Sequence, residues 1–397
     1  MSTQMPPSIP PGAPDEPRRA SMARTISTAL TVLIALAVAA VFARSALSSA
    51  LIFFVVLVSL VVAHELAHFA TAKLFGVQVL EFGVGFPPRI GAKRFGETEY
   101  SVNWLPLGGF VRLLGEEDPS DPRSLAAHPK WQRLIVLVSG SVINLLLPIV
   151  LFAFAFTWPH EEAIGRARLD SVLPGSPAEA AGLRAGDVIY EVGGRNAKNV
   201  AEAGRYIRLN LGHETDFLVQ RDGEFVTVRV TPRWTPPDGQ GPTGIVILPQ
   251  QPFTERVVQP PWQSLPNGLR ATAESMLLAR NELLSWFKGG AAPAVAGPVA
   301  IAQTTGEVAK EGGISPLLEL AALLSINLGI MNLLPLPMLD GGRAMFVVIE
   351  VLRRGRRIAP EKEALVHLVG FVLFIVLAVV VTFSDISRIV AGESLFR

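Results

Sequence analysis

Apolar residues gather in five long blocks, separated by polar segments of very different lengths. These runs carry almost no charge and cover about residues 28–43, 46–63, 134–158, 317–339 and 365–383. A helix needs about 20 mostly apolar residues to cross the hydrocarbon core of a bilayer, and four of the runs reach or approach that length. The pattern predicts a polytopic α-helical membrane protein with four core transmembrane helices.

The first and shortest run permits two interpretations. Arg18, Arg19 and Arg24 precede it, as basic residues precede the apolar region of a cleaved signal peptide. The small residues of a cleavage site are poorly defined after it, which favours a retained helix. We therefore expect an extra N-terminal transmembrane helix at 25–44, behind a proline-rich, disordered cytoplasmic tail at 1–24.

Basic residues in the short loops predict the orientation. The tail is basic, and a second basic cluster separates the last two apolar runs, with Arg353, Arg354, Arg356 and Arg357. The positive-inside rule places both segments in the cytoplasm. With five helices, the long stretch at 159–315 then lies outside.

Three polar segments show their own patterns. Residues 97–113 read as a cytoplasmic-side β-hairpin with its turn at Gly108-Gly109. Residues 163–250 alternate short strands with turns and two short helices, which indicates a compact α+β domain inserted between the membrane halves. Residues 259–316 form an amphipathic and linker region. Its leucines recur at helical spacing, either on a core-packed helix or on a helix lying on the membrane surface.

Composition narrows the chemistry. The 397 residues are 50% hydrophobic and 17% charged, and a net charge of +1 gives no reason to expect a nucleic-acid partner. There is no cysteine, which excludes disulfides, iron–sulfur clusters, thiolate zinc sites and cysteine nucleophiles. A metal site must therefore use His, Asp or Glu.

The second apolar run leads directly into a metal-binding pattern. His64, Glu65 and His68 form an H-E-x-x-H motif. Positions i and i+4 of a helix share one face, so both imidazoles can converge on one zinc ion, with Glu65 beside a bound water. Ionisable groups in a membrane helix are functional by default. The ligand type indicates zinc, although Fe(II) or Co(II) would also fit.

A catalytic zinc needs a third protein ligand. Asp340 is the best candidate, because it is the only acidic residue between Glu319 and Glu350 and closes an apolar run that Pro335 and Pro337 interrupt. Irregular backbone at membrane depth is tolerated only where it lines a buried or wet cavity. The other four histidines are predicted to have solvated or packing roles: His128, His160, His213 and His367.

These motifs resemble the site-2 protease family, the bacterial intramembrane zinc metalloproteases that regulate sigma factors. The resemblance covers about residues 46–385 and keeps the family's motif order. The matching segments are H-E-x-x-H at 64–68, P-L-G-G-F-V-R at 106–112, Gly140 with Asn144, G-P-V-A-I-A at 297–302, and the run from Asn332 through Pro335-Leu336-Pro337 to Asp340-Gly341.

The resemblance implies roles for individual residues. His64, His68 and Asp340 would bind zinc, and Glu65 would be the catalytic acid/base. The family's hairpin lies at the membrane interface near the active site. Substrate-binding positions implied by the matching motifs are Asn327, Asn332, Asn144, Gly108 and Gly109. The helix at 25–44 is an addition to the family core.

The inserted domain resembles a bacterial PDZ domain over residues 173–189, where Pro177 suits a helix start, Gly182 a helix end and Gly186-Asp187 a turn. PDZ domains bind extended C-terminal peptides by strand addition. This domain is either a folded cap that excludes large substrates by size or a specific peptide receptor.

The resemblance implies an intramembrane zinc protease in the bacterial cell (inner) membrane. It would cut single-pass proteins already shortened outside, such as anti-sigma factors or signal-peptide remnants, with its active site towards the cytoplasm and its PDZ domain outside. The protease core would comprise 46–158 and 317–385.

Three other functions are possible from the sequence. One is a membrane-anchored PDZ scaffold or chaperone with an inactive metal site. The others are a transporter, for which no internal repeat is found, and a tethered protease acting on soluble peptides.

Overall fold

The computed structural model describes residues 44–290 and 296–391. The predicted tail at 1–24 lies outside the described residues. The extra helix predicted at 25–44 does so too, apart from its last residue.

Within this described part, four helices are long and apolar enough to cross a membrane. They are α2 (Arg44–Leu74), α3 (Lys130–Thr157), α8 (Ile314–Leu333) and α10 (Pro360–Val390). The prediction of four core membrane helices is thereby confirmed. A one-turn 3-10 helix at Leu125–Ala127 leads into α3.

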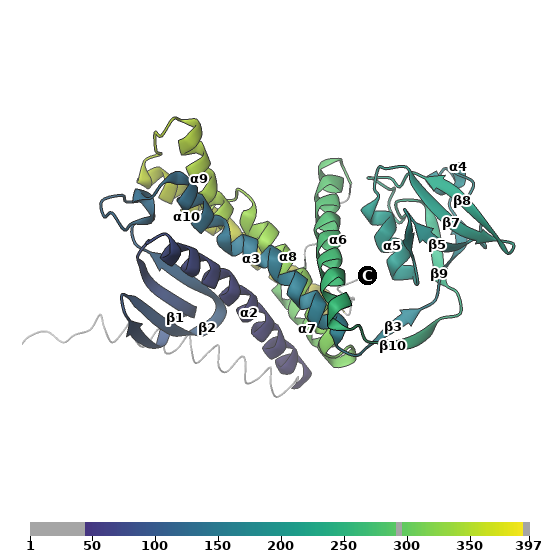
Figure 1. Ribbon diagram of the computed structural model, residues 1–397, viewed down its shortest axis with the longest axis horizontal. Coiled ribbons are helices and arrows are strands. Elements are labelled where there is room, and N and C mark those ends of the chain that lie inside the picture. The colour runs from purple at the N-terminus through teal and green to yellow at the C-terminus, as the bar shows by residue number, and fades with distance from the viewer. Residues whose placement is uncertain (1–43, 291–295, 392–397) are drawn as a thin grey trace, which may run out of the picture.

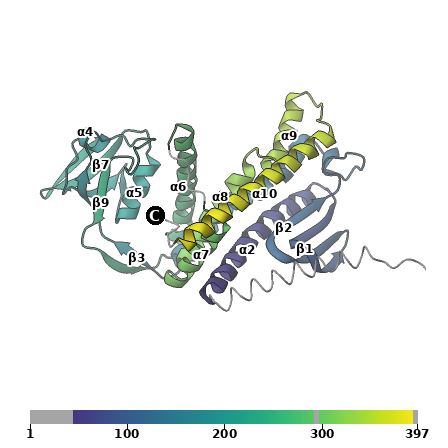
Figure 2. The same cartoon turned by 180° about the vertical axis from the view of Figure 1, so that it is seen from behind.

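Small residues bring these helices together. α2, α3 and α8 form the centre of the membrane part, and α10 lies along its outside (Figures 1 and 2). A Cβ added at Gly329 of α8 would lie 3.0 Å from the Ser141 carbonyl oxygen of α3. Gly306 of α7 (Pro298–Glu311) packs as closely on Ser49 of α2. Such contacts are typical of membrane helices, whose association depends on close packing.

The apolar run predicted at 317–339 is not one helix. α8 ends at Leu333, two residues before Pro335, and a loop of residues 334–339 leads into α9 (Asp340–Leu352). Proline lacks the N–H that a helix interior needs, so the interruption expected from the two prolines is confirmed. Asp340 therefore begins a new helix instead of ending the old one.

The hairpin prediction is wrong in its boundaries. The strands are β1 (Val79–Phe95) and β2 (Thr98–Leu113), joined by a turn at Gly96 with φ of +61°. Residues 97–113 thus supply one strand instead of two. Gly108 and Gly109 lie within β2 and serve close packing: a Cβ at Gly109 would lie 3.1 Å from the Gly83 carbonyl oxygen. Residues 81–84 pair with 99–102 and also with 109–112, so the two long strands fold into a curved sheet beside α2 (Figure 1).

The inserted segment forms a domain with its own core. One six-stranded sheet has the order β8-β7-β5-β4-β9, with β6 paired to β5. Phe217, Ile189 and Leu169 are among the fully buried side chains between this sheet and its helices. The strands are β4 (Ala167–Val172), β5 (Val188–Val192), β6 (Arg195–Asn196), β7 (Thr215–Arg221), β8 (Glu224–Val230) and β9 (Ile245–Pro249), and the helices are α4 (Pro177–Ala180) and α5 (Val200–Leu209).

A ribbon and a helix connect this domain to the membrane part. The ribbon pairs β3 (His160–Ile164) with β10 (Phe253–Val257). The helix is α6 (Pro261–Phe287), whose Asn281 amide donates to the carbonyl oxygens of Arg208 and Leu209 at the end of α5, at 2.9 and 3.2 Å. The domain therefore rests on α6 (Figure 1).

α6 itself packs mainly through small and polar residues. It contacts α3, where a Cβ at Gly268 would lie 2.6 Å from the Ile149 carbonyl oxygen. The buried positions are small or polar, such as Ser264, Ala271 and Thr272. Leu265 and Leu269 are more than half exposed, whereas Met276 packs against the buried cluster that α6 shares with α3 and α8. The helix is thus packed in the molecule, while its exposed leucines can still face a membrane surface, so both interpretations of this helix remain predictions.

Candidate metal centre

His64 and His68 lie one helical turn apart on α2 and point to the same side. Both are nearly buried, at 5% and 8% exposure. Their Nε2 atoms lie 3.2 Å apart, an approach that the i and i+4 spacing allows. Two imidazole nitrogens thus meet at one point inside the helix bundle.

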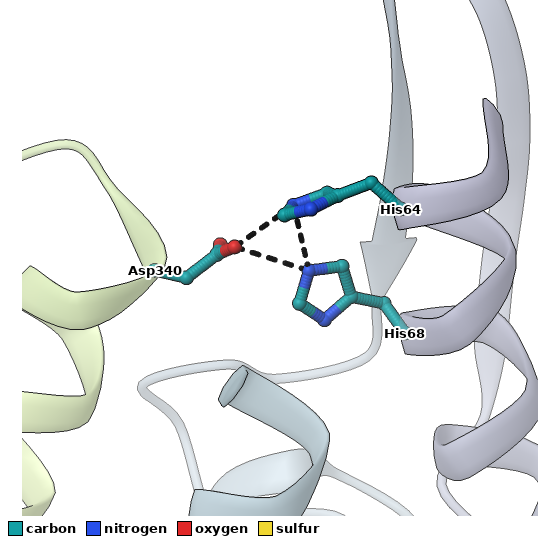
Figure 3. Close-up of side chains that lie close together, drawn as sticks. All are labelled: His64, His68 and Asp340. Atoms are coloured by element: carbon teal, nitrogen blue, oxygen red, sulfur yellow. Dashed lines mark hydrogen bonds and ion pairs between the residues drawn. The ribbon is translucent and has the colours of Figure 1, made fainter. Parts of the chain in front are cut away.

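Asp340 reaches this point from the first turn of α9. Its Oδ2 atom lies 2.9 Å from His64 Nε2 and 3.2 Å from His68 Nε2. Figure 3 shows the three side chains converging from two elements, with Asp340 more than 270 residues after the histidines in the chain. In the part of the chain that the structure describes, this is the one cluster of three such groups found close enough to hold a metal ion.

The three distances fit a zinc ion. Zinc bonds to nitrogen and oxygen of about 2.0–2.1 Å at the tetrahedral angle place neighbouring ligand atoms about 3.3–3.4 Å apart. The observed separations of 2.9, 3.2 and 3.2 Å are within a few tenths of an ångström of that spacing. Two neutral imidazoles and one carboxylate also leave the fourth tetrahedral position open.

A backbone carbonyl orients His68. Its Nδ1 atom lies 2.7 Å from the Val136 carbonyl oxygen of α3. A carbonyl oxygen only accepts, so Nδ1 carries the ring proton and Nε2 keeps the lone pair that a metal needs. Such outer contacts commonly fix the tautomer of metal-binding histidines.

Asn144 lies at Nδ1 of His64, as the Val136 carbonyl lies at Nδ1 of His68. Its amide lies 3.2 Å from His64 Nδ1, while its Oδ1 is buried without a hydrogen-bond partner among the described residues. When His64 Nε2 binds a metal, Nδ1 carries the proton and needs an acceptor. Turning the amide by 180° makes Oδ1 that acceptor, so the orphaned atom fits a metal-loaded site.

This placement departs from the expected role of Asn144. The residue is fully buried, at 0% exposure, behind a candidate metal ligand. A substrate contact needs an accessible polar group, and the side-chain amide of Asn144 is not accessible. The geometry gives it the orientation of His64 instead of a substrate contact.

Gly140 makes room for the histidines. A Cβ there would lie 2.6 Å from His64 Nε2 and would overlap His68 Nε2. Any side chain at this position of α3 would therefore occupy the space where the ligand atoms converge. The sequence resemblance drew attention to Gly140, but only the packing explains the need for glycine.

Glu65 lies beside the strand β2. A Cβ at Gly109 would lie 3.2 Å from Glu65 Cγ, so the glycine allows β2 to pass close to the glutamate. Gly108 is buried against the Phe86 ring of β1. The structure thus brings Glu65 and Gly109 together, whereas Gly108 has a packing role within the sheet.

The two remaining predicted residues lie on α8. Asn327 is exposed and Asn332 is half-buried near the end of the helix, eight residues before Asp340. Neither side chain hydrogen-bonds within the described residues. No sequence motif indicated Arg343, one turn beyond Asp340, which forms an ion pair of 2.7 Å with Glu116 after β2. This ion pair links α9 to the segment that follows the sheet.

Comparison with known proteins supports the same chemistry. The model of peptidase family M50 matches residues 52–377, a range that contains all three candidate ligands. The chain is 30% identical to zinc metalloprotease RasP of Geobacillus kaustophilus, over 86% of this chain and 98% of that protein.

Two further relatives extend the comparison. RasP of Oceanobacillus iheyensis is 29% identical over 85% of this chain and 98% of its own length. The membrane metalloprotease ARASP, chloroplastic, of Arabidopsis thaliana is 32% identical over 83% of this chain and 77% of its own length.

Proposed function

The chain belongs to peptidase family M50, the site-2 proteases, and is a zinc metalloprotease; we propose that it hydrolyses peptide bonds inside the transmembrane segments of single-pass membrane proteins. The observation that carries this proposal is the location of the ligands. His64 and His68 lie on α2, which is apolar enough to cross a membrane over Leu47–Leu74. A protease acting on soluble peptides would need its metal outside the bilayer.

Each residue of the site has a task in peptide hydrolysis. His64, His68 and Asp340 would hold zinc, which when bound acts as a Lewis acid towards the scissile carbonyl and the attacking water. Glu65 accepts a proton from that water as its oxygen adds to the carbonyl carbon. It then delivers the proton to the leaving nitrogen as the carbon–nitrogen bond breaks. Glu65 is therefore a carboxylate again at the end of the reaction.

The substrate must be partly unwound, because the carbonyl groups of an intact helix are hydrogen-bonded and covered. Residues 109–112 of β2 pair with residues 81–84, and Gly109 lies next to Glu65. An unwound segment adding to this strand would form main-chain hydrogen bonds with little demand on its side chains. We assign Asn327 and Asn332 on the α8 side as further contacts to the substrate backbone.

The inserted domain is assigned as a single PDZ domain. Its sheet has β9 at one edge, and the edge residues Val246 and Leu248 are substantially exposed. An extended peptide could pair with this strand. The domain acts either as a size filter that excludes substrates with large outer parts or as a receptor for the C-terminus left by a first cleavage.

The orientation follows from the two ends of α3. Gly355, within the basic loop after α9, lies near Lys130 at the start of α3, and the inserted domain follows the other end, after Thr157. The positive-inside rule places the basic loop in the cytoplasm. The PDZ domain is then extracytoplasmic, in a bacterial cell membrane, and substrates are anti-sigma factors or signal-peptide remnants trimmed on that side.

A co-expression experiment tests this function. The chain and its Glu65→Gln variant are each produced with a panel of single-pass membrane proteins already shortened outside. We expect cleavage inside a transmembrane segment by the unmodified chain and none by the variant, with zinc bound to both. No cleavage by either protein, together with a stable complex of the domain and a peptide, would instead support a scaffold.

A further inference from the structure

The loop that delivers Asp340 holds an uncommon backbone conformation. Residues 334–339 connect α8 to α9, and Met338, two residues before Asp340, has φ of +71°. A non-glycine residue in this left-handed region is uncommon and needs support from its surroundings. The position of Asp340 depends on how this loop is held.

His367 of α10 contacts the loop at that residue. The backbone N–H of Met338 donates a hydrogen bond of 2.7 Å to His367 Nδ1. One turn further along α10, Gly370 lies so close to Pro337 that a Cβ would overlap the proline Cβ. α10 therefore touches the loop at two successive residues.

The hydrogen bond defines the state of the His367 ring. Because Nδ1 accepts from a backbone donor, the ring proton is on Nε2. Nε2 is buried and has no hydrogen-bond partner among the described residues. The ring also packs on Phe346 of α9, with centroids 5.5 Å apart. Phenylalanine would make that ring contact without burying a polar atom, so packing alone does not account for a histidine here.

Apart from His367, the described side chains of α10 make few polar contacts near the candidate metal site. Its side chains are exposed along most of the helix, and Figure 2 shows it along the outside of the bundle. The contact of His367 with Met338 therefore links an outer helix of the bundle to the chain segment that carries a candidate metal ligand.

We propose that His367 is a positioning residue, which holds the 334–339 loop through Met338 and thereby keeps the Asp340 carboxylate in place to bind the metal. The proposal rests on the proposed function in so far as Asp340 is taken as a ligand. It replaces the packing role that the sequence indicated for His367. A positioning role through Nδ1 requires an acceptor at that point and not merely a ring.

Metal affinity of the full-length chain tests this role. The protein is purified in detergent, and its zinc affinity is measured by competition with a chelator, with the absorption spectrum of bound Co(II) as a second readout. His367→Phe keeps the ring but removes the acceptor, and we expect about tenfold weaker zinc binding and an altered Co(II) spectrum. Leu368→Phe is the matched control, since Leu368 is 59% exposed on the same helix; it should bind zinc as the unmodified chain does.

Two polar substitutions separate the acceptor from general polarity. His367→Asn places an oxygen where Nδ1 lies and should restore affinity, whereas the longer side chain of His367→Gln should not. The Asn and Gln variants show whether an acceptor at the place of Nδ1 is needed, even if His367→Phe fails to fold. Equal zinc affinity in the Asn and Gln variants, or unchanged affinity in His367→Phe, would overturn the proposal.

The same assay distinguishes this inference from the proposed function. Asp340→Asn should weaken zinc binding whether or not proteolysis is observed. If it does, and His367 behaves as expected, the positioning role stands even if no membrane substrate is cut. If Asp340→Asn leaves zinc affinity unchanged, Asp340 is not a ligand, and the positioning role falls with the metal site.

Discussion

Gly140 of α3 lies directly against His64 of α2, so that a Cβ on the glycine would come within 2.6 Å of the histidine Nε2. Two membrane helices thus pack tightly against each other where the ligand atoms converge. The metal site depends on this approach as much as on its ligands.

Gly140→Ala should therefore disable the site without touching a ligand. The added methyl group would displace both imidazoles, and we expect zinc affinity to fall at least about tenfold, with proteolysis lost in parallel. Chelator competition on the purified protein measures the affinity. Val142→Ala, at a partly exposed position two residues along the same helix, should behave as the unmodified chain. Normal zinc binding by Gly140→Ala would show that the helices are further apart than described.

Asn144 should affect the metal and not the substrate. Asn144→Leu leaves His64 Nδ1 without an acceptor, and we expect about a tenfold loss of zinc affinity. Asn144→Asp keeps an acceptor oxygen and should retain most of the affinity. If Asn144→Leu bound zinc normally but raised the KM for a membrane substrate, the residue would be a substrate contact after all.

The inserted domain should lose stability in acid through one ion pair. Asp187 is 1% exposed and forms a 2.7 Å ion pair with Arg221. Burial raises the pKa of Asp187, but hydrogen bonds from Arg221 and from the Arg184 N–H outweigh that effect and hold the pKa below its usual range. The folded pKa is thus lower than the unfolded value of about 3.9. The stabilisation is complete above that value and is lost as the pH falls through the folded pKa.

Asp187→Asn should accordingly lower the free energy of unfolding of this domain by about 2 kcal/mol at neutral pH. The difference from the unmodified chain should shrink below about pH 4. Hydrogen exchange of β5 and β7 in the full-length protein, corrected for the intrinsic rate at each pH, measures this difference in the free energy of unfolding. Asp216→Asn, whose carboxylate pairs with Arg229 on the surface, is the control and should change little. A constant difference between pH 3 and pH 7 would contradict this account.

Cleavage should depend on how readily the substrate helix unwinds. Replacing helix-weakening residues near the cut by leucine should slow hydrolysis, because more of the segment must be unwound against its own hydrogen bonds before it can pair with β2. Product formation from matched substrates in vesicles measures this. Rates that do not respond to helix stabilisation would argue against capture of an unwound strand.

The membrane helices and the ligand set could be predicted from the sequence because each depends on a local pattern. A bilayer demands a continuous apolar run, and the i and i+4 spacing alone brings His64 and His68 together. Asp340 was predictable as an isolated acidic residue beside prolines. The spacing that brings its Oδ2 within 3.2 Å of both histidines could only come from the fold.

Glycine and histidine were harder to interpret because each serves several purposes. Gly108 and Gly109 were expected in a turn, yet they permit close packing, while the turn uses Gly96. His367 reads as a packing residue until its contact with the Met338 N–H, 29 residues away in the chain, is known. Such roles depend on backbone groups that no side-chain pattern reveals.

Reconstitution tests the central claim most directly. The purified, zinc-loaded chain and its Glu65→Gln variant are placed in lipid vesicles with one trimmed single-pass protein, and the masses of the products locate the cut. We expect a cut within the transmembrane segment, made by the unmodified chain and abolished by removing zinc or by Glu65→Gln. A cut in the soluble flank, or one that survives Glu65→Gln, would contradict it.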